Sequence, residues 1–213
     1  MKMVTVDYRG LGLGALSYLI EEPYHEYYFH LGRFIHAFAK AEDILLELLR
    51  MVSGLSKARA GVVFHGTRAE GARDLIFRLL EARKDTALKK RLEPIFAQMA
   101  TIGTMRNNIV HWGSTHSIDN TFFVSNEKLK PLKPKSFYFD INDFDRMGSD
   151  ISKIILLLQY EININAISKE DYETFVQYPW RYKPPQPYRK PKARNLDQAK
   201  PQRLRRASAR SQG

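Results

Sequence analysis

The segment from Leu88 to His111, LKKRLEPIFAQMATIGTMRNNIVH, carries the clearest structural signal in the chain. Its apolar residues recur at intervals of three and four, which is the period of one face of an α-helix. Asp85, just upstream, is suited to cap the first turn of this helix. Pro94 lies inside the pattern, so we expect either a kink or a short helix followed by a second one. The apolar series consists of Leu88, Leu92, Ile95, Met99, Ile102 and Ile109.

Three further segments show the same helical period. The first spans about residues 27–52, and Gly54 follows it in a position suited to end a helix. The second spans about residues 67–82, where Thr67 and Glu70 have the spacing of a capping box. The third spans about residues 142–167. Each segment has enough apolar residues on one face to bury that face against another helix.

Two β-prone runs, 121–124 and 136–140, lie between the last two helical segments. They predict a small hairpin at about residues 120–140, packed on the side of the helices. Strands and helices do not alternate, so the expected fold is all-α, an antiparallel bundle of four to five helices over residues 25–172. Residues 1–24 form an N-terminal segment whose structure the sequence does not determine, apart from a turn at 10–14.

The composition excludes several classes of protein. No apolar run is long enough to span a bilayer and no secretory signal precedes the first helix, so we expect a cytoplasmic protein that does not contact a membrane. The chain has no cysteine, which removes disulfides and cysteine nucleophiles and agrees with a reducing compartment. Its six histidines are scattered without the spacing of metal ligands, so neither a metal nor another cofactor is expected.

The net charge of +11 is concentrated at the C-terminal end. Residues 173–213 hold eleven Lys and Arg against two acidic residues, which leaves a net charge of +2 for residues 1–172. The same stretch holds six of the ten prolines, so we expect a Pro-rich basic tail that is extended and largely disordered from about residue 178.

Two roles are open for this tail: a solubilising linker, or an arm that attracts RNA by releasing counterions. Aromatic residues interleaved with the basic ones favour RNA, because bases stack on aromatic rings. The tail residues expected to bind RNA are Arg181, Lys183, Arg189, Lys190, Arg205 and Arg206.

Arg106 interrupts the apolar series of the 88–111 helix. A guanidinium at such a position is costly unless it is paired or faces a cavity or a partner. Glu42, on the apolar series of the 27–52 helix, is a candidate for that pairing. Asn107 and His111 are four residues apart and share a helix face, which the long Arg106 side chain can reach. Asn108 is expected to support this group.

These side chains suit metal-independent transesterification of RNA. Arginine offers a planar fork for phosphate oxygens, and histidine can take a proton from a ribose 2′-OH or give one to a leaving 5′-oxygen. Asn107 can orient the imidazole or donate to the phosphate. A structural alternative stays open from the residues alone. In it Arg106 is a core arginine paired with Glu42, and His111 interacts favourably with the end of the helix dipole.

The R-N-x-x-x-H pattern of Arg106, Asn107 and His111, together with the order of the helices, resembles the HEPN superfamily, the higher eukaryotes and prokaryotes nucleotide-binding domain. The resemblance covers about residues 25–168. It implies a helical bundle that forms a homodimer, in which two Arg/His motifs face each other across a composite cleft. In active relatives it implies metal-independent endoribonuclease activity, often as a toxin or defence component with an antitoxin protein as partner.

Within this resemblance Arg106 holds the scissile phosphate, His111 transfers protons and Asn107 supports either. Relatives paired with a nucleotidyltransferase antitoxin carry a tyrosine two residues after the histidine. This chain has Gly113 there, so that kind of modification is not expected. Other relatives have lost catalysis and serve as dimeric modules that bind RNA, a nucleotide or a protein. The two expected functions are therefore an endoribonuclease and, as the alternative, a non-catalytic binding module.

Overall fold

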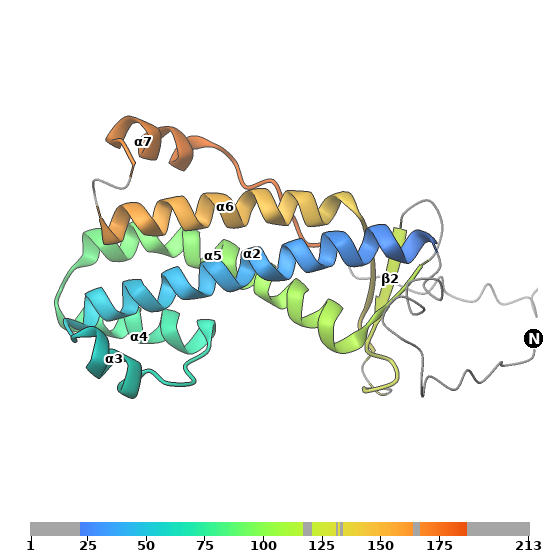
Figure 1. Cartoon of the computed structure of the whole chain (residues 1–213), viewed down its shortest axis with the longest axis horizontal. Coiled ribbons are helices and arrows are strands. Elements are labelled where there is room, and N and C mark those ends of the chain that lie inside the picture. The colour runs from blue at the N-terminus through green and yellow to red at the C-terminus, as the bar shows by residue number, and fades with distance from the viewer. Residues whose placement is uncertain (1–21, 117–120, 131, 133, 164–166, 187–213) are drawn as a thin grey trace, which may run out of the picture.

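The computed structural model describes residues 22–116, 121–130, 132, 134–163 and 167–186, and within these ranges the chain is mostly helical (Figure 1). A small antiparallel sheet joins the helices, with its strands in the order β1-β2-β3. None of the described helices is both long and apolar enough to cross a bilayer. The helices are α2 (Glu22–Ser53), α3 (Lys57–Val63), α4 (Ala69–Ala82), α5 (Thr86–Trp112), α6 (Asn142–Ile162) and α7 (Lys169–Gln177). The strands are β1 (Ser114–His116), β2 (Thr121–Ser125) and β3 (Ser136–Asp140).

The hydrophobic core lies where α2, α4, α5 and α6 pack against one another. Both α2 and α5 contact α4 and α6. Most of the apolar positions predicted from the helical period are buried here, which confirms the four predicted helices. Each fully buried aliphatic or aromatic side chain contributes about 1.5–3 kcal/mol relative to exposure. Examples from the four helices are Leu45, Ile76, Met99 and Ile154. The last of these helices, α6, ends at Ile162 rather than at the expected residue 167.

The helices do not alternate in direction as the expected antiparallel bundle requires. Gln98 of α5 contacts Asp150 of α6, and Arg91 contacts Glu161, so these two helices are antiparallel. The short connection after α4 likewise makes α4 and α5 antiparallel. Figure 1 shows that α2, α4 and α6 run in one direction and α5 in the other. The reason is the connection from α2 to α4, which returns through α3 instead of through a short turn.

The start of α4 differs from the prediction, because the expected capping box does not form. The N-cap residue is Arg68, which makes no side-chain capping hydrogen bond, and the helix begins at Ala69. The Thr67 N–H donates instead to the Phe64 carbonyl at 3.0 Å, which closes the turn after α3. Gly66 has a φ of +73° in this turn, a value that favours glycine. Thr67 therefore lies one residue before the N-cap Arg68, outside the helix.

The helix α5 is continuous from Thr86 to Trp112 although it contains Pro94. Of the two expectations, the short helix followed by a restart is therefore wrong. Proline removes one helical hydrogen bond, but Leu92, Ile95 and Phe96 are buried on both sides of it and hold the chain in register. The expected cap is confirmed, since the Asp85 carboxylate accepts the Leu88 N–H at 3.0 Å.

The predicted hairpin is confirmed as β2 and β3, which are antiparallel. β1 is an additional strand that pairs with the other edge of β2. Phe122 and Phe139 of the sheet are buried, and the Phe122 ring lies 4.4 Å from the ring of Tyr27 in α2. The sheet lies at the end of the molecule where α2 begins and α5 ends, rather than along the side of the helices (Figure 1).

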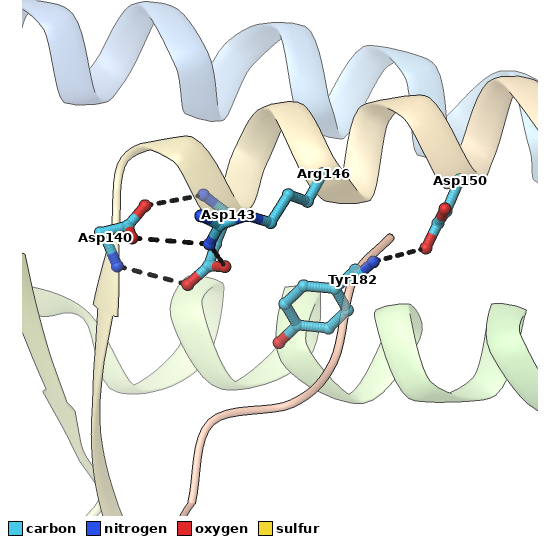
Figure 2. Close-up of polar contacts among 5 residues, drawn as sticks. All are labelled: Asp140, Asp143, Arg146, Asp150 and Tyr182. Carbon is cyan, nitrogen blue, oxygen red and sulfur yellow. Dashed lines mark hydrogen bonds and ion pairs between the residues drawn. The ribbon is translucent and has the colours of Figure 1, made fainter. Parts of the chain in front are cut away.

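The C-terminal strap, residues 178–186, packs against the helices although the sequence predicts disorder from about residue 178. Tyr182 is only 1% exposed, and its ring lies between α6 and α5 (Figure 2). The buried Asp150 carboxylate of α6 accepts the backbone N–H groups of Arg181 and Tyr182, both at 2.9 Å. It also accepts Nε2 of Gln98 at 2.8 Å. The folded part of the chain thus extends beyond the expected boundary at residue 172 and includes α7.

The corner between β3 and α6 is fixed by a separate polar cluster in the same view (Figure 2). Asp140 and Asp143 accept each other's backbone N–H groups, at 3.1 and 3.3 Å. Arg146 binds both carboxylates, with its Nη1 2.7 Å from Asp143 and 3.5 Å from Asp140. This cluster sets where α6 starts and therefore how the sheet meets the helices.

Candidate functional site

Arg106 lies at the edge of the buried face of α5. Ile102, Met105 and Ile109 are buried, and the core series therefore passes through Met105, whereas Arg106 is half-buried beside it. The interruption predicted from the sequence is real, but the helix resolves it by placing a methionine in the core and the guanidinium at its border. Arg106 is thus held at the rim of the core and is not an ordinary solvated arginine.

The Arg106 guanidinium is directed by two neighbours. Its Nη1 donates to Oδ1 of Asn107 at 2.9 Å, which brings it toward the face that Asn107 shares with His111. Its Cζ lies 6.0 Å from the centroid of the Phe38 ring in α2, at the outer limit of a cation–π contact. Its Nε is buried and has no hydrogen-bond partner among the described residues. One donor of this cation is therefore unsatisfied.

Gly103 allows the Phe38 ring to lie against α5 one turn before Arg106. A Cβ built at Gly103 would be 3.3 Å from Cζ of Phe38, closer than most such contacts. The absence of a side chain at this position lets α2 present both Phe38 and Glu42 to the same stretch of α5. Phe38 in turn limits the positions that the Arg106 side chain can take.

A pocket of about 620 Å³ lies between α2, α4 and α5, and the sequence-predicted residues converge on it. Arg106, Asn107 and His111 line it from α5, and Glu42 lines it from α2. Arg68 and Arg73 line it from the start of α4, together with Glu70. Asn108 is half-buried and is not among the described residues that line the pocket. The remaining lining residues are Phe38, Ala69, Met99, Ala100, Gly103 and Thr104.

The arginines of the pocket differ in how many hydrogen bonds their guanidinium groups make to the rest of the protein. Arg73 donates through Nη1 to the Phe96 carbonyl at 3.0 Å and through Nε to the Ala69 carbonyl at 3.3 Å. It therefore holds α4 against α5. Arg68 is exposed and makes no side-chain capping bond, and Arg106 lines the pocket with a side-chain hydrogen bond to Asn107. These two guanidinium groups are available to an anion in the pocket.

Glu42 does not form the candidate ion pair with Arg106, although both side chains line the pocket. Among the described residues, Arg106 has its hydrogen bond to Asn107 and no ion pair with a carboxylate. Burial raises the pKa of the half-buried Glu42 carboxyl above its usual value of 4.5, and this effect exceeds the opposing attraction of Arg106. The nearby negative charge of Asp43 raises the pKa further. Glu42 is therefore a weakened acid facing a pocket.

Arg68, Arg73 and Phe38 are the residues of this site that the sequence does not point to. Arg68 and Arg73 are five apart on α4, a spacing without the regularity of a motif, and Phe38 looks like an ordinary core residue. Only the packing of α4 across α2 and α5 brings them to the motif. The one available signal is that Arg68 directly precedes a helix start, where backbone N–H groups lack partners.

The tail residues expected to bind RNA do not reach this pocket where the structure describes them. Arg181 and Lys183 are exposed on the C-terminal strap, and Nη1 of Arg181 lies 3.4 Å from Oγ of Ser149. The strap contacts α5 through Gln98, whose Nε2 donates to the Tyr182 carbonyl at 3.1 Å. Gln98 precedes Arg106 by eight residues, about two helical turns, and is not among the described residues that line the pocket. Arg189, Lys190, Arg205 and Arg206 lie outside the described residues.

Within the described ranges, no three His, Asp or Glu side chains converge as metal ligands would. The pocket instead offers guanidinium groups, one imidazole, one amide and two carboxyl groups, a set that can bind an anion and exchange protons. Comparison of the chain with models of known protein families, with curated protein sequences and with solved structures finds no match.

Proposed function

We propose that the chain is a metal-independent endoribonuclease of the HEPN type, with its active site in the pocket between α2, α4 and α5. The observation that carries the proposal is that Arg106, Asn107 and His111 line one pocket together with a second available guanidinium, that of Arg68. A phosphodiester presents oxygens that bind such planar donors, and a histidine beside it can transfer protons near neutral pH.

The proposed reaction is a transesterification that needs no added water or metal. The ribose 2′-oxygen attacks the adjacent phosphorus and loses its proton to a basic group. The P–O5′ bond breaks, and the 5′-oxygen receives a proton from an acidic group. The products are a 2′,3′-cyclic phosphate and a 5′-hydroxyl. Arg106 binds the non-bridging oxygens, on which negative charge increases in the transition state, and His111 serves at one of the two proton transfers.

The proposal includes a HEPN-like helical bundle and a homodimer. In support of the bundle, a long helix comes first, the motif lies at the end of α5, and one long helix follows. In support of a dimer, the motif end of α5 leaves Asn107, Val110 and His111 exposed, and Val110 is an apolar residue that a second copy can cover. Action on RNA in the cytoplasm, and control by an antitoxin protein, belong to the same proposal.

Cleavage of a pool of random single-stranded RNA in the presence of EDTA tests the function. The wild-type chain is expected to shorten the RNA, and His111→Ala to abolish shortening. His36→Ala is the matched control, because His36 is also exposed but lines a different pocket. Cutting that persists in His111→Ala contradicts the role of His111. If the wild-type chain binds the RNA but never cuts it, the result would contradict the enzyme and support the alternative, a non-catalytic binding module.

A further inference from the structure

The proposed reaction requires two proton-transfer groups, and the pocket holds a second candidate beside His111. One group must accept the 2′-hydroxyl proton and another must donate to the 5′-oxygen. Of the carboxyl groups that line the pocket, Glu70 is exposed, whereas Glu42 is half-buried on α2. Glu42 and His111 line the same pocket from different helices, α2 and α5.

The surroundings of Glu42 fit a proton-transfer group better than a structural ion pair. The charges that act on its carboxyl group are those of Arg106 on α5 and Asp43 on its own helix. The other titratable residues that line the same pocket are His111 of α5 and Arg68, Glu70 and Arg73 of α4. Arg106 attracts its negative charge, yet burial outweighs that attraction and the pKa is raised. A structural partner of Arg106 would be fully ionised and in direct contact with it. A carboxyl group with a raised pKa beside a pocket is the usual condition of an acid–base group.

We infer that Glu42 is the general base of this site and that His111 is its general acid. The inference rests on the proposed function and deepens it. The Glu42 carboxylate takes the proton of the 2′-hydroxyl as the 2′-oxygen attacks phosphorus. The His111 imidazolium gives a proton to the 5′-oxygen as the P–O5′ bond breaks. Afterwards Glu42 is protonated and His111 is neutral, and exchange with water restores both.

This assignment makes the acid–base pair complete within one chain. The Arg106 guanidinium is held by Asn107 and Phe38 and not by Glu42. It can therefore bind the phosphate without removing the carboxylate from the reaction. Glu42 stays free to act on a 2′-hydroxyl placed on its side of the phosphate.

The dependence of kcat/KM on pH tests the inference, measured on the same RNA pool in EDTA. In the wild-type chain the rate should fall at low pH, because a protonated Glu42 can no longer accept the 2′-hydroxyl proton. Glu42→Gln should lower kcat/KM by about 10²- to 10⁴-fold and remove the fall on the acid side. Glu42→Asp keeps a carboxylate and should keep the acid-side fall, at a reduced rate.

Asp43→Asn is the matched control, since it removes one carboxylate from the same helix without lining the pocket. It should keep the acid-side fall, moved slightly to lower pH because Asp43 raises the pKa of Glu42. An unchanged profile in Glu42→Gln, with cleavage still dependent on His111, overturns the role of Glu42 and leaves the proposed function standing. A wild-type chain that cuts no RNA overturns both.

Discussion

The apolar period of α5 would place Arg106, a charged residue, in the core beside Met105. The helix can bury only one residue there, and it buries the methionine. Arg106 is left beside the core with its Nε unsatisfied, a condition that costs about 1–3 kcal/mol for a buried polar group. The rest of the Arg106 guanidinium is held by Asn107 and Phe38 and lines the pocket, where the proposed phosphate would bind.

The raised pKa of Glu42 predicts the effect of Glu42→Gln on stability. A carboxyl group with a higher pKa in the folded than in the unfolded chain binds its proton more tightly when folded. Its charge therefore destabilises the fold as pH rises above the unfolded value, which is near the usual 4.5. Glu42→Gln should raise the free energy of unfolding at pH 7, and the gain should shrink as pH falls toward 4.5.

Urea unfolding of both chains at several pH values measures this difference. The competing account, in which Glu42 is the ion-pair partner of Arg106, requires the opposite sign. Under it the substitution would leave the guanidinium without its partner and would lower stability at pH 7. Such a loss would return Glu42 to a structural role.

How much of the site the sequence predicts depends on whether each residue lies on the motif's own helix. Arg106, Asn107 and His111 are found from spacing alone, because the helical period fixes which of them share a face. Glu42 is found because it interrupts the apolar series of another helix. Arg68 and the precise role of Phe38 cannot be found in this way, because no local pattern states which helix will cross α5 at Gly103.

Among the elements, the C-terminal strap gives the sharpest prediction. Asp150→Ala leaves three donors without an acceptor: the N–H groups of Arg181 and Tyr182, and Nε2 of Gln98. Because all three lie around a carboxylate that is 1% exposed, we expect a loss of about 3–5 kcal/mol in the free energy of unfolding, measured with urea.

Asp145→Ala is the control on the same helix. The Asp145 side chain is 62% exposed and lies 3.4 Å from Nδ1 of His30, so its removal should cost less than about 1 kcal/mol. Equal effects of the two substitutions would mean that the strap does not contribute to the stability of the fold.

The elements that the sequence predicts are those whose own apolar residues recur with a clear helical or strand period. The four core helices and the β2–β3 hairpin are of this kind. The short α3 exposes Val62 and Val63, so its apolar residues do not form the face that the period detects. The strap is anchored by Tyr182 and Trp180, which stand among prolines and basic residues. Its burial depends on Gln98, Asp150 and Lys153, which lie far away in the sequence. Composition therefore predicts disorder where tertiary contacts give order.

For the whole molecule, the structure shows that the basic tail should be truncated after the C-terminal strap and not before it. Truncation after Gln186 keeps the strap and removes nine Lys and Arg against one Asp. We expect the free energy of unfolding to stay the same and the dependence of RNA affinity on salt to become weaker, because fewer counterions are released. Truncation after Gln177 also removes Tyr182 and should lower stability as well.

Fluorescence titrations of labelled RNA at several salt concentrations, together with urea unfolding, check both truncations. A salt dependence that is the same with and without residues 187–213 would show that the tail does not bind RNA. The RNA affinity would then come from the folded part of the chain.

The chemical identity of the RNA ends tests the central claim most directly. The wild-type chain, His111→Ala and His36→Ala are each incubated with the RNA pool in EDTA, and the products are analysed by mass spectrometry. The pocket of Arg106, Asn107 and His111 predicts fragments with 2′,3′-cyclic phosphate and 5′-hydroxyl ends from the wild-type chain and from His36→Ala, and intact RNA with His111→Ala. Uncut RNA with the wild-type chain, or cyclic phosphate ends that persist with His111→Ala, would contradict the account.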